Sequence, residues 1–70
     1  MKPLDALNKL MDSEVLVKLK NGIEITGTLK AFDIHINLVL ADARFHDSNG
    51  DVERKFKQIF IRGDMILFVS

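Results

Sequence analysis

The sequence predicts a mainly β fold in which one short N-terminal helix precedes a strongly bent, five-stranded antiparallel sheet that closes as a small barrel. Leucines recur at helical spacing only near the start of the chain. From Glu14 onward, short apolar or alternating runs are separated by polar turns, which is typical of strands joined by hairpins. A chain of 70 residues has room for one core, so we expect a single domain.

The helix is expected within residues 2–11, KPLDALNKLM. Pro3 suits the first turn of a helix, because the N–H that proline lacks has no partner there in any case. Asp5 near the start and Lys9 near the end carry the charges that the helix dipole favours at those positions. A helix this short is marginal by itself, so it must pack on the rest of the domain.

The first hairpin is expected to join residues 14–20 (EVLVKLK) to residues 23–32 (IEITGTLKAF). Apolar residues recur at every second position of the first run, as in a strand with one buried face. Asn21 and Gly22, between the two runs, are a strong signal for a two-residue turn. Gly27 lies inside the second run, where a glycine predicts a bulge or a sharp bend.

Three further strands complete the predicted sheet. The third covers residues 38–45 (LVLADARF) and runs into a polar hairpin loop at residues 46–51 (HDSNGD). The fourth covers residues 54–61 (RKFKQIFI), and the last covers residues 65–69 (MILFV) after an Arg-Gly-Asp sequence. Short strands with tight connections of this kind favour closure into a small barrel.

The last strand is apolar at every position, although a small barrel buries only one face of each strand. Residues 59–61 show the same excess. Exposed apolar edges invite pairing with another chain, and head-to-tail pairing of two different edges produces a ring when the rotation closes. The alternative is a hydrophobic tail buried within a monomer. That alternative does not explain what adds stability to a domain whose core is so small.

Composition excludes several classes of function. Ten basic residues balance ten acidic ones, which argues against tight, non-specific binding to nucleic acid and favours recognition of bases in a defined pocket. The absence of cysteine and the presence of only two histidines argue against disulfides, a structural metal site and a metal cofactor. No stretch resembles a signal peptide or a membrane span, so we expect a cytoplasmic protein without membrane partners.

A group of three polar residues interrupts an apolar run. Within residues 31–43 (AFDIHINLVLADA), the polar residues Asp33, His35 and Asn37 occupy every second position. A period of two places them on one face of a strand, and a tight loop could also bring them together. They either form a functional site or are exposed to solvent without a function.

Two segments resemble the two motifs of a known family. Residues 22–43 (GIEITGTLKAFDIHINLVLADA) are similar to the first Sm motif, and residues 59–69 (IFIRGDMILFV) are similar to the second. Because both occur in order and at the family's separation, the chain resembles the Sm-like (LSm) family in its archaeal and eukaryotic branch. The resemblance implies one Sm-like domain over residues 1–70, with the helix in 1–12, the first motif region in 14–46 and the second in 53–70.

The resemblance also implies architecture and function. The Sm fold is a helix followed by a five-stranded, SH3-like barrel, and its copies form a ring of six or seven through the fourth strand of one subunit and the fifth of its neighbour. Such rings bind single-stranded, uridine-rich RNA around the pore and act in RNA metabolism or ribonucleoprotein assembly. The partners implied are RNA, further copies of the chain and, where a ring is mixed, a paralogous Sm-like subunit.

Three residues match positions of the family that contact the base. By resemblance, His35 and Arg62 are the flat groups between which a uracil stacks, and Asn37 reads the edge of the base. The chemistry agrees, because stacking is indifferent to sequence, whereas a carboxamide can match the donor and acceptor of uracil. Discrimination against cytosine then requires that the amide be held in one orientation.

Three further residues match supporting positions. The resemblance assigns to Asp64 the role of holding the Asn37 amide, and to Asp33 that of supporting its loop. Gly63 is expected to permit a tight turn. His46 matches no site of the family, and we expect it to be a solvent-facing loop residue.

Other interpretations remain open at this point. The sequence departs from the family pattern at Met65, Lys57 and Ile34, which bear on ring size and base preference. The chief alternative function is a ring used only for protein interaction or scaffolding. An enzyme is not expected, since the only imaginable acid–base pair is Asp33 with His35 and the chain is too small for a conventional cleft.

Overall fold

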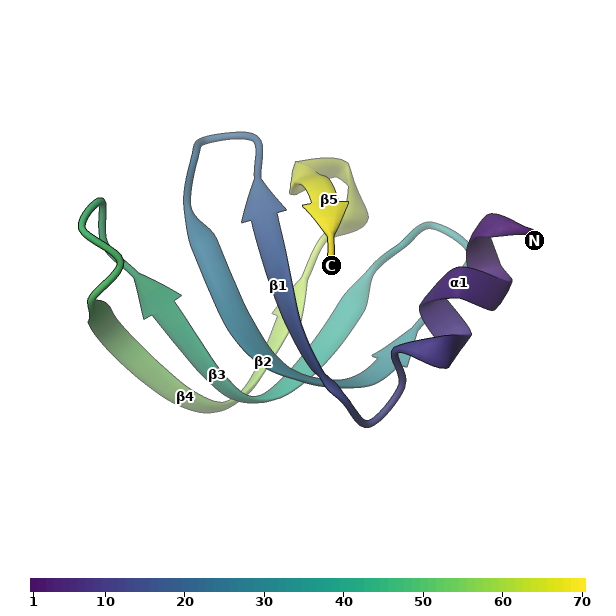
Figure 1. The fold of residues 1–70 in the computed structure, drawn as a ribbon, viewed down its shortest axis with the longest axis horizontal. Coiled ribbons are helices and arrows are strands. Elements are labelled where there is room, and N and C mark those ends of the chain that lie inside the picture. The colour runs from purple at the N-terminus through teal and green to yellow at the C-terminus, as the bar shows by residue number, and fades with distance from the viewer.

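The computed structural model describes residues 1–70 and contains one α-helix and five strands (Figure 1). All pairing is antiparallel, in the spatial order β4-β3-β2-β1-β5, as predicted for a mainly β chain. The helix is too short to cross a membrane. The elements are α1 (Pro3–Lys9), β1 (Glu14–Leu19), β2 (Glu24–Phe32), β3 (Leu38–His46), β4 (Val52–Ile61), a 3-10 turn η1 (Gly63–Met65) and β5 (Ile66–Val69).

The sheet bends sharply at Gly27, as the sequence predicts. The register between β2 and β3 shifts across this glycine, between Thr26 and Thr28, and the extra residue on β3 is Asp42, which has a φ of 51°. A Cβ at position 27 would lie 3.0 Å from the backbone oxygen of Ala41 and 3.2 Å from the Cα of Ala43. The two backbones therefore approach at a distance that leaves no room for a side chain, and the sheet curves around its own concave face (Figure 1).

The concave face holds the hydrophobic core. In β1 and in residues 24–29 of β2 every second residue is buried, which is the period expected of strands with one covered face. Leu7, Leu10 and Met11, at the end of α1 and just after it, pack against this core. The buried core residues are Val15, Val17, Leu19, Ile25, Leu29, Leu38, Leu40, Ala43 and Ile61.

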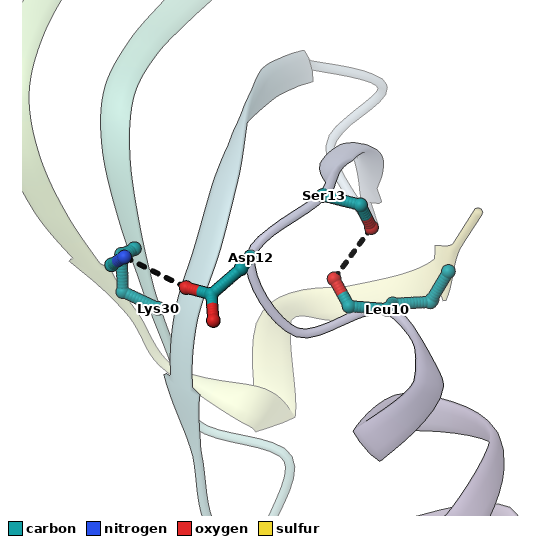
Figure 2. Close-up of polar contacts among 4 residues, drawn as sticks. All are labelled: Leu10, Asp12, Ser13 and Lys30. Carbon is teal, nitrogen blue, oxygen red and sulfur yellow. Dashed lines mark hydrogen bonds and ion pairs between the residues drawn. The ribbon is translucent and has the colours of Figure 1, made fainter.

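The junction after α1 fastens the helix to the sheet (Figure 2). Ser13 Oγ donates to the carbonyl oxygen of Leu10 at 2.6 Å, and Asp12 Oδ1 pairs with Lys30 Nζ at 2.7 Å. The Asp12 N–H also donates to Leu29 O at 2.7 Å, and the Leu29 N–H donates to Ser13 O at 3.0 Å. These bonds to β2 hold in place a seven-residue helix that is too short to be stable alone.

The first hairpin differs from the prediction. Its loop has three residues, Lys20 to Gly22, because the Leu19 N–H donates to Ile23 O at 2.9 Å. Gly22 has a φ of 90°, but Asn21 keeps a negative φ. A two-residue type I′ turn needs positive φ at both central positions, so the Asn-Gly pair instead forms the end of a three-residue loop with a left-handed glycine.

Both edges of the sheet are free of partners. β4 and β5 follow each other in the chain through η1, but each pairs with only one strand, so hydrogen bonds do not close the barrel. Phe60 on β4 and Leu67 and Phe68 on β5 are exposed. The sheet is thus strongly bent and open, with one apolar edge at each end, as the excess of apolar residues in these strands predicts.

Candidate nucleic-acid interface

Two loops that are far apart in the sequence meet in one pocket. The first is residues 33–37, which join β2 to β3, and the second is the turn after β4 that contains η1. The pocket has a volume of about 460 Å³ and an entirely polar or glycine lining: His35, Asn37, Arg62, Gly63 and Asp64. The fold therefore assembles the five pocket residues that the two sequence motifs predict.

Asp33 organises the first loop. Its Oδ1 accepts hydrogen bonds from the N–H groups of His35 at 2.9 Å and Asn37 at 3.1 Å. Its own N–H donates to Asn37 O at 3.3 Å, and its carbonyl accepts from the Ile36 N–H at 3.0 Å. An aspartate that bonds backbone groups two and four residues ahead fixes a tight loop, so the expectation that Asp33 supports this loop matches its contacts.

The Asn37 side chain is held on both sides. Its Oδ1 accepts from the Gly63 N–H at 2.8 Å, and its Nδ2 donates to Asp33 Oδ2 at 3.0 Å. A backbone N–H can only donate and a carboxylate can only accept, so the two partners leave a single orientation for the amide. One hydrogen on Nδ2 and one lone pair on Oδ1 remain for a ligand.

Gly63 lets the two loops touch. A Cβ at this position would collide with the carbonyl oxygen of His35 and would lie 2.9 Å from the carbonyl carbon of Ile36. The glycine is therefore required by close backbone contact between the loops, and the turn itself keeps an ordinary φ. This contact brings residues of both loops into the lining of one pocket.

Known proteins decide the family. The sequence profile described as the LSM domain matches residues 5–70. The chain belongs to the LSM family. An snRNP Sm-like protein of Archaeoglobus fulgidus is 52% identical over 69 residues, which cover 99% of this chain and 88% of that protein.

Solved LSM structures share the whole fold. The Sm protein of Pyrococcus abyssi in complex with a uridine heptamer is 44% identical, with a TM-score of 0.95 over 100% of this chain and 97% of that one. The SmAP1 heptamer of Pyrobaculum aerophilum is 37% identical, with a TM-score of 0.92 over 100% and 92% of the two chains. The Sm fold predicted from the two motifs is thus confirmed.

One contact expected from the LSM resemblance is absent. The Asp64 carboxylate does not hold Asn37. Asp64 Oδ2 instead accepts from the Arg62 guanidinium at 2.9 Å, and Asp33 supplies the carboxylate for Asn37. The expectation for Asp64 was wrong because Asp64 sits in a 3-10 turn within reach of the guanidinium two residues before it. In the LSM pocket of this chain, Asp33 both supports the loop and orients the amide.

The charge of Asp33 depends on this network. The hydrogen bond from the Asn37 side chain holds the pKa of the Asp33 carboxyl below its ordinary value, and the bonds from the backbone N–H groups of His35 and Asn37 act in the same direction. The carboxylate is therefore ionised at neutral pH, where it can accept all three bonds. His35, Arg62 and Asp64 are exposed to solvent beside it.

The loop is expected to resist acid. The pKa of Asp33 is lower in the folded protein than in the unfolded chain. The ionised carboxylate therefore contributes fully to the stability of the fold above the unfolded pKa, and this contribution is lost as pH falls through the folded pKa. The Asn37 side-chain amide should therefore keep its neutral-pH NMR shifts at a pH where an ordinary aspartate is already protonated. The measurement is a pH titration of the Asn37 Nδ2 resonances. A midpoint at or above that of an ordinary aspartate would contradict the expectation.

His46 lies outside the pocket and differs from the prediction of a solvent-facing residue. It is half-buried, with Nε2 at 2.8 Å from Thr26 Oγ1 and Nδ1 at 3.2 Å from Gly50 O. A carbonyl can only accept, so Nδ1–H donates to Gly50 O, while the Thr26 hydroxyl, which can donate or accept, pairs with Nε2. His46 thus ties the loop between β3 and β4 to β2. Sequence reasoning missed this role because Thr26 is remote in sequence.

Proposed function

We propose that this chain binds single-stranded, uridine-rich RNA as a ring of its own copies, with one base in each pocket. The observation that carries the proposal is the fixed orientation of the Asn37 amide between Asp33 and Gly63. The solved relative from Pyrococcus abyssi, which holds a uridine heptamer, supports the same ligand.

The free atoms of Asn37 match uracil. Uracil presents a donor at N3–H beside an acceptor at O4, and these fit the remaining lone pair on Oδ1 and the remaining hydrogen on Nδ2. Cytosine presents an acceptor at N3 and a donor at its amino group, so it would place acceptor against acceptor and donor against donor. Because the amide cannot rotate without breaking its bonds to Asp33 and Gly63, cytosine is disfavoured.

Flat groups are available to stack on the base. His35 lines the pocket with Arg62, and both side chains are exposed rather than packed in the core. Stacking of a base on such a group contributes about 1–3 kcal/mol. The Arg62 guanidinium is held by Asp64 at 2.9 Å, which restricts its motion and lowers the entropy lost when a base binds.

Ring assembly is supported by the free edges of the sheet. β4 and β5 each lack one partner, and both present exposed apolar side chains. The relative from Pyrobaculum aerophilum is a heptamer. In a ring, identical pockets would engage successive nucleotides of one strand at high effective concentration, so individually weak sites would hold RNA tightly. We assign a binding function and no catalytic step, because the hydrogen bonds of the pocket hold its side chains in place and leave Asn37 one donor and one acceptor for a base.

Binding of labelled oligouridine and oligocytidine, followed by fluorescence anisotropy, tests the proposal. The wild type should prefer oligouridine by about 10-fold or more, since a two-bond contact to a base edge contributes about 1–3 kcal/mol of discrimination. Light scattering should show a ring under the same conditions. A ring that binds neither oligomer would support scaffolding instead.

Asp33→Asn should reduce the preference for uridine. The substituted side chain keeps one acceptor but places an amide NH2 group where the Asn37 Nδ2 needs a carboxylate, so only the Gly63 N–H still holds the Asn37 orientation. We expect the ratio of the two affinities to fall by about 10-fold. Asp64→Asn is the matched control, because Asp64 contacts Arg62 and should alter overall affinity while leaving the ratio near that of the wild type. A ratio lost only in Asp64→Asn would reverse the assignment.

A further inference from the structure

Three hairpin loops of this chain share one backbone form. In the loops 19–23, 33–37 and 47–51, the first N–H donates to the last carbonyl, at 2.9, 3.3 and 2.9 Å. In each loop the N–H of the fourth residue also donates to the first carbonyl, at 3.0 Å. The fourth residue is left-handed in all three, with φ of 90° at Gly22, 62° at Ile36 and 86° at Gly50.

Only the loop at the pocket lacks glycine at this position. Glycine adopts a left-handed backbone without cost, whereas a β-branched residue does so rarely. The other non-glycine residues with positive φ are Asp12 and Asp42, and aspartate tolerates this conformation. Ile36 is therefore the one residue with a positive φ whose type disfavours that conformation. Glycine occupies the corresponding position in loops 19–23 and 47–51 and so fits the same backbone form.

The side chain of Ile36 offers a reason for the strain. It is half-buried and packs against the hydrophobic core, so it attaches the loop to the rigid part of the domain. His35 and Asn37, which line the pocket, are its two neighbours in the chain. The Gly63 backbone lies against the His35–Ile36 peptide on the other side. The loop is thus held between the core and the second loop of the pocket.

The geometry points to Ile36 as a positioning residue for RNA binding. Its anchorage in the core keeps the loop in one place and so sets where His35 and Asn37 stand relative to Arg62 and Gly63. Strain at such a residue persists only where the surrounding structure imposes it, as in other preorganised sites. This inference rests on the proposed function, because the geometry that Ile36 maintains is that of the proposed base pocket.

Replacement of Ile36 can distinguish its role in holding the pocket loop in place from a role in the overall stability of the domain. Ile36→Gly and Ile36→Asn both accept the left-handed backbone but lose the apolar anchor, whereas Ile36→Leu keeps an apolar side chain. We expect the first two variants to bind oligouridine about 10-fold more weakly, as for a loop that is competent about a tenth of the time. Ile36→Leu should bind within about 3-fold of the wild type. The thermal midpoint of Ile36→Gly should stay close to that of the wild type, because the relief of strain offsets the lost packing.

Hydrogen exchange at the Gly63 N–H gives a readout that needs no RNA. This amide donates to Asn37 Oδ1, so a loosened loop should raise its exchange rate about 10-fold in Ile36→Gly and leave it unchanged in Ile36→Leu. Gly50→Ala, in the corresponding loop remote from the pocket, is the control: it should lower the thermal midpoint without changing RNA affinity or Gly63 exchange.

The outcomes distinguish the two proposals. If the wild type binds oligouridine and Ile36→Gly binds it equally well with unchanged Gly63 exchange, the role of Ile36 is overturned and the proposed function stands. If affinity falls only in proportion to a fall in the thermal midpoint, Ile36 is a stability residue and the inference is also overturned. If the wild type does not bind RNA, the proposed function fails, and the inference about RNA fails with it.

Discussion

Gly63→Ala is expected to abolish tight binding of oligouridine. The added Cβ collides with the carbonyl oxygen of His35, which is backbone and cannot rotate away. The two loops must separate, so the Gly63 N–H moves away from Asn37 Oδ1 and the base loses both its stacking geometry and its fixed edge contact. Loss of about 3 kcal/mol from these two terms corresponds to about 100-fold weaker binding.

The same substitution should lower stability measurably. Overpacking of this kind costs about 1–3 kcal/mol. For a domain of this size, 2 kcal/mol corresponds to a fall of about 10 °C in the thermal midpoint. Anisotropy titration and thermal unfolding of one preparation measure both effects. Gly50→Ala provides the comparison, because a Cβ at position 50 meets no atom within 4 Å and only the left-handed backbone is strained. Wild-type affinity in Gly63→Ala would show that the loops are not in contact in solution.

Asn37→Ala should remove the preference for uridine. No other pocket side chain combines a donor and an acceptor in one amide group, so the remaining stacking on His35 and Arg62 cannot tell uracil from cytosine. Affinity for oligouridine should fall by about 10-fold or more, while affinity for oligocytidine changes less. The partly buried Gly63 N–H also loses its acceptor, which costs about 1–3 kcal/mol of stability.

Asp51→Ala is a matched control for Asn37→Ala. Asp51 closes loop 47–51 in the way that Asn37 closes loop 33–37, since its N–H donates to Asp47 Oδ1 at 3.0 Å. It lies outside the pocket, so its replacement should leave both RNA affinities unchanged. Ring assembly is checked in each variant by light scattering. A uridine preference that survives in an intact Asn37→Ala ring would assign base recognition to another residue.

The strands could be predicted because their signals are local. Alternating burial in β1 and β2, the bend at Gly27 and the apolar edges β4 and β5 all follow from spacing that can be read along the chain. The grouping of His35 and Asn37 with Arg62 came from the resemblance of two motifs, because no local pattern relates residues so far apart.

Two predictions from local sequence differed from the structure, one for a turn and one for a histidine. Asn21-Gly22 is typical of a two-residue turn, but the glycine ends a three-residue loop because Asn21 keeps a negative φ. His46 in a polar loop resembled a solvent-facing residue, yet Thr26 and Gly50 provide partners for both ring nitrogens. The turn is decided by the bond from the Leu19 N–H to Ile23 O, and the place of His46 is decided by Thr26 on the neighbouring strand and Gly50 in its own loop.

The sequence by itself determined the strand pattern, the bend and the residue types of the pocket, since these depend on spacing and side-chain chemistry. Only the tertiary structure decided which carboxylate orients Asn37. Asp33 and Asp64 both lie in the two motifs, and the carboxylate of either could accept a hydrogen bond from the Asn37 amide. The choice depends on where two loops touch: Gly63 brings its N–H to Asn37 Oδ1, Asp64 turns to Arg62, and Asp33 is left facing Nδ2. Contacts between segments distant in the chain are set by the packing of the sheet, which no local pattern specifies.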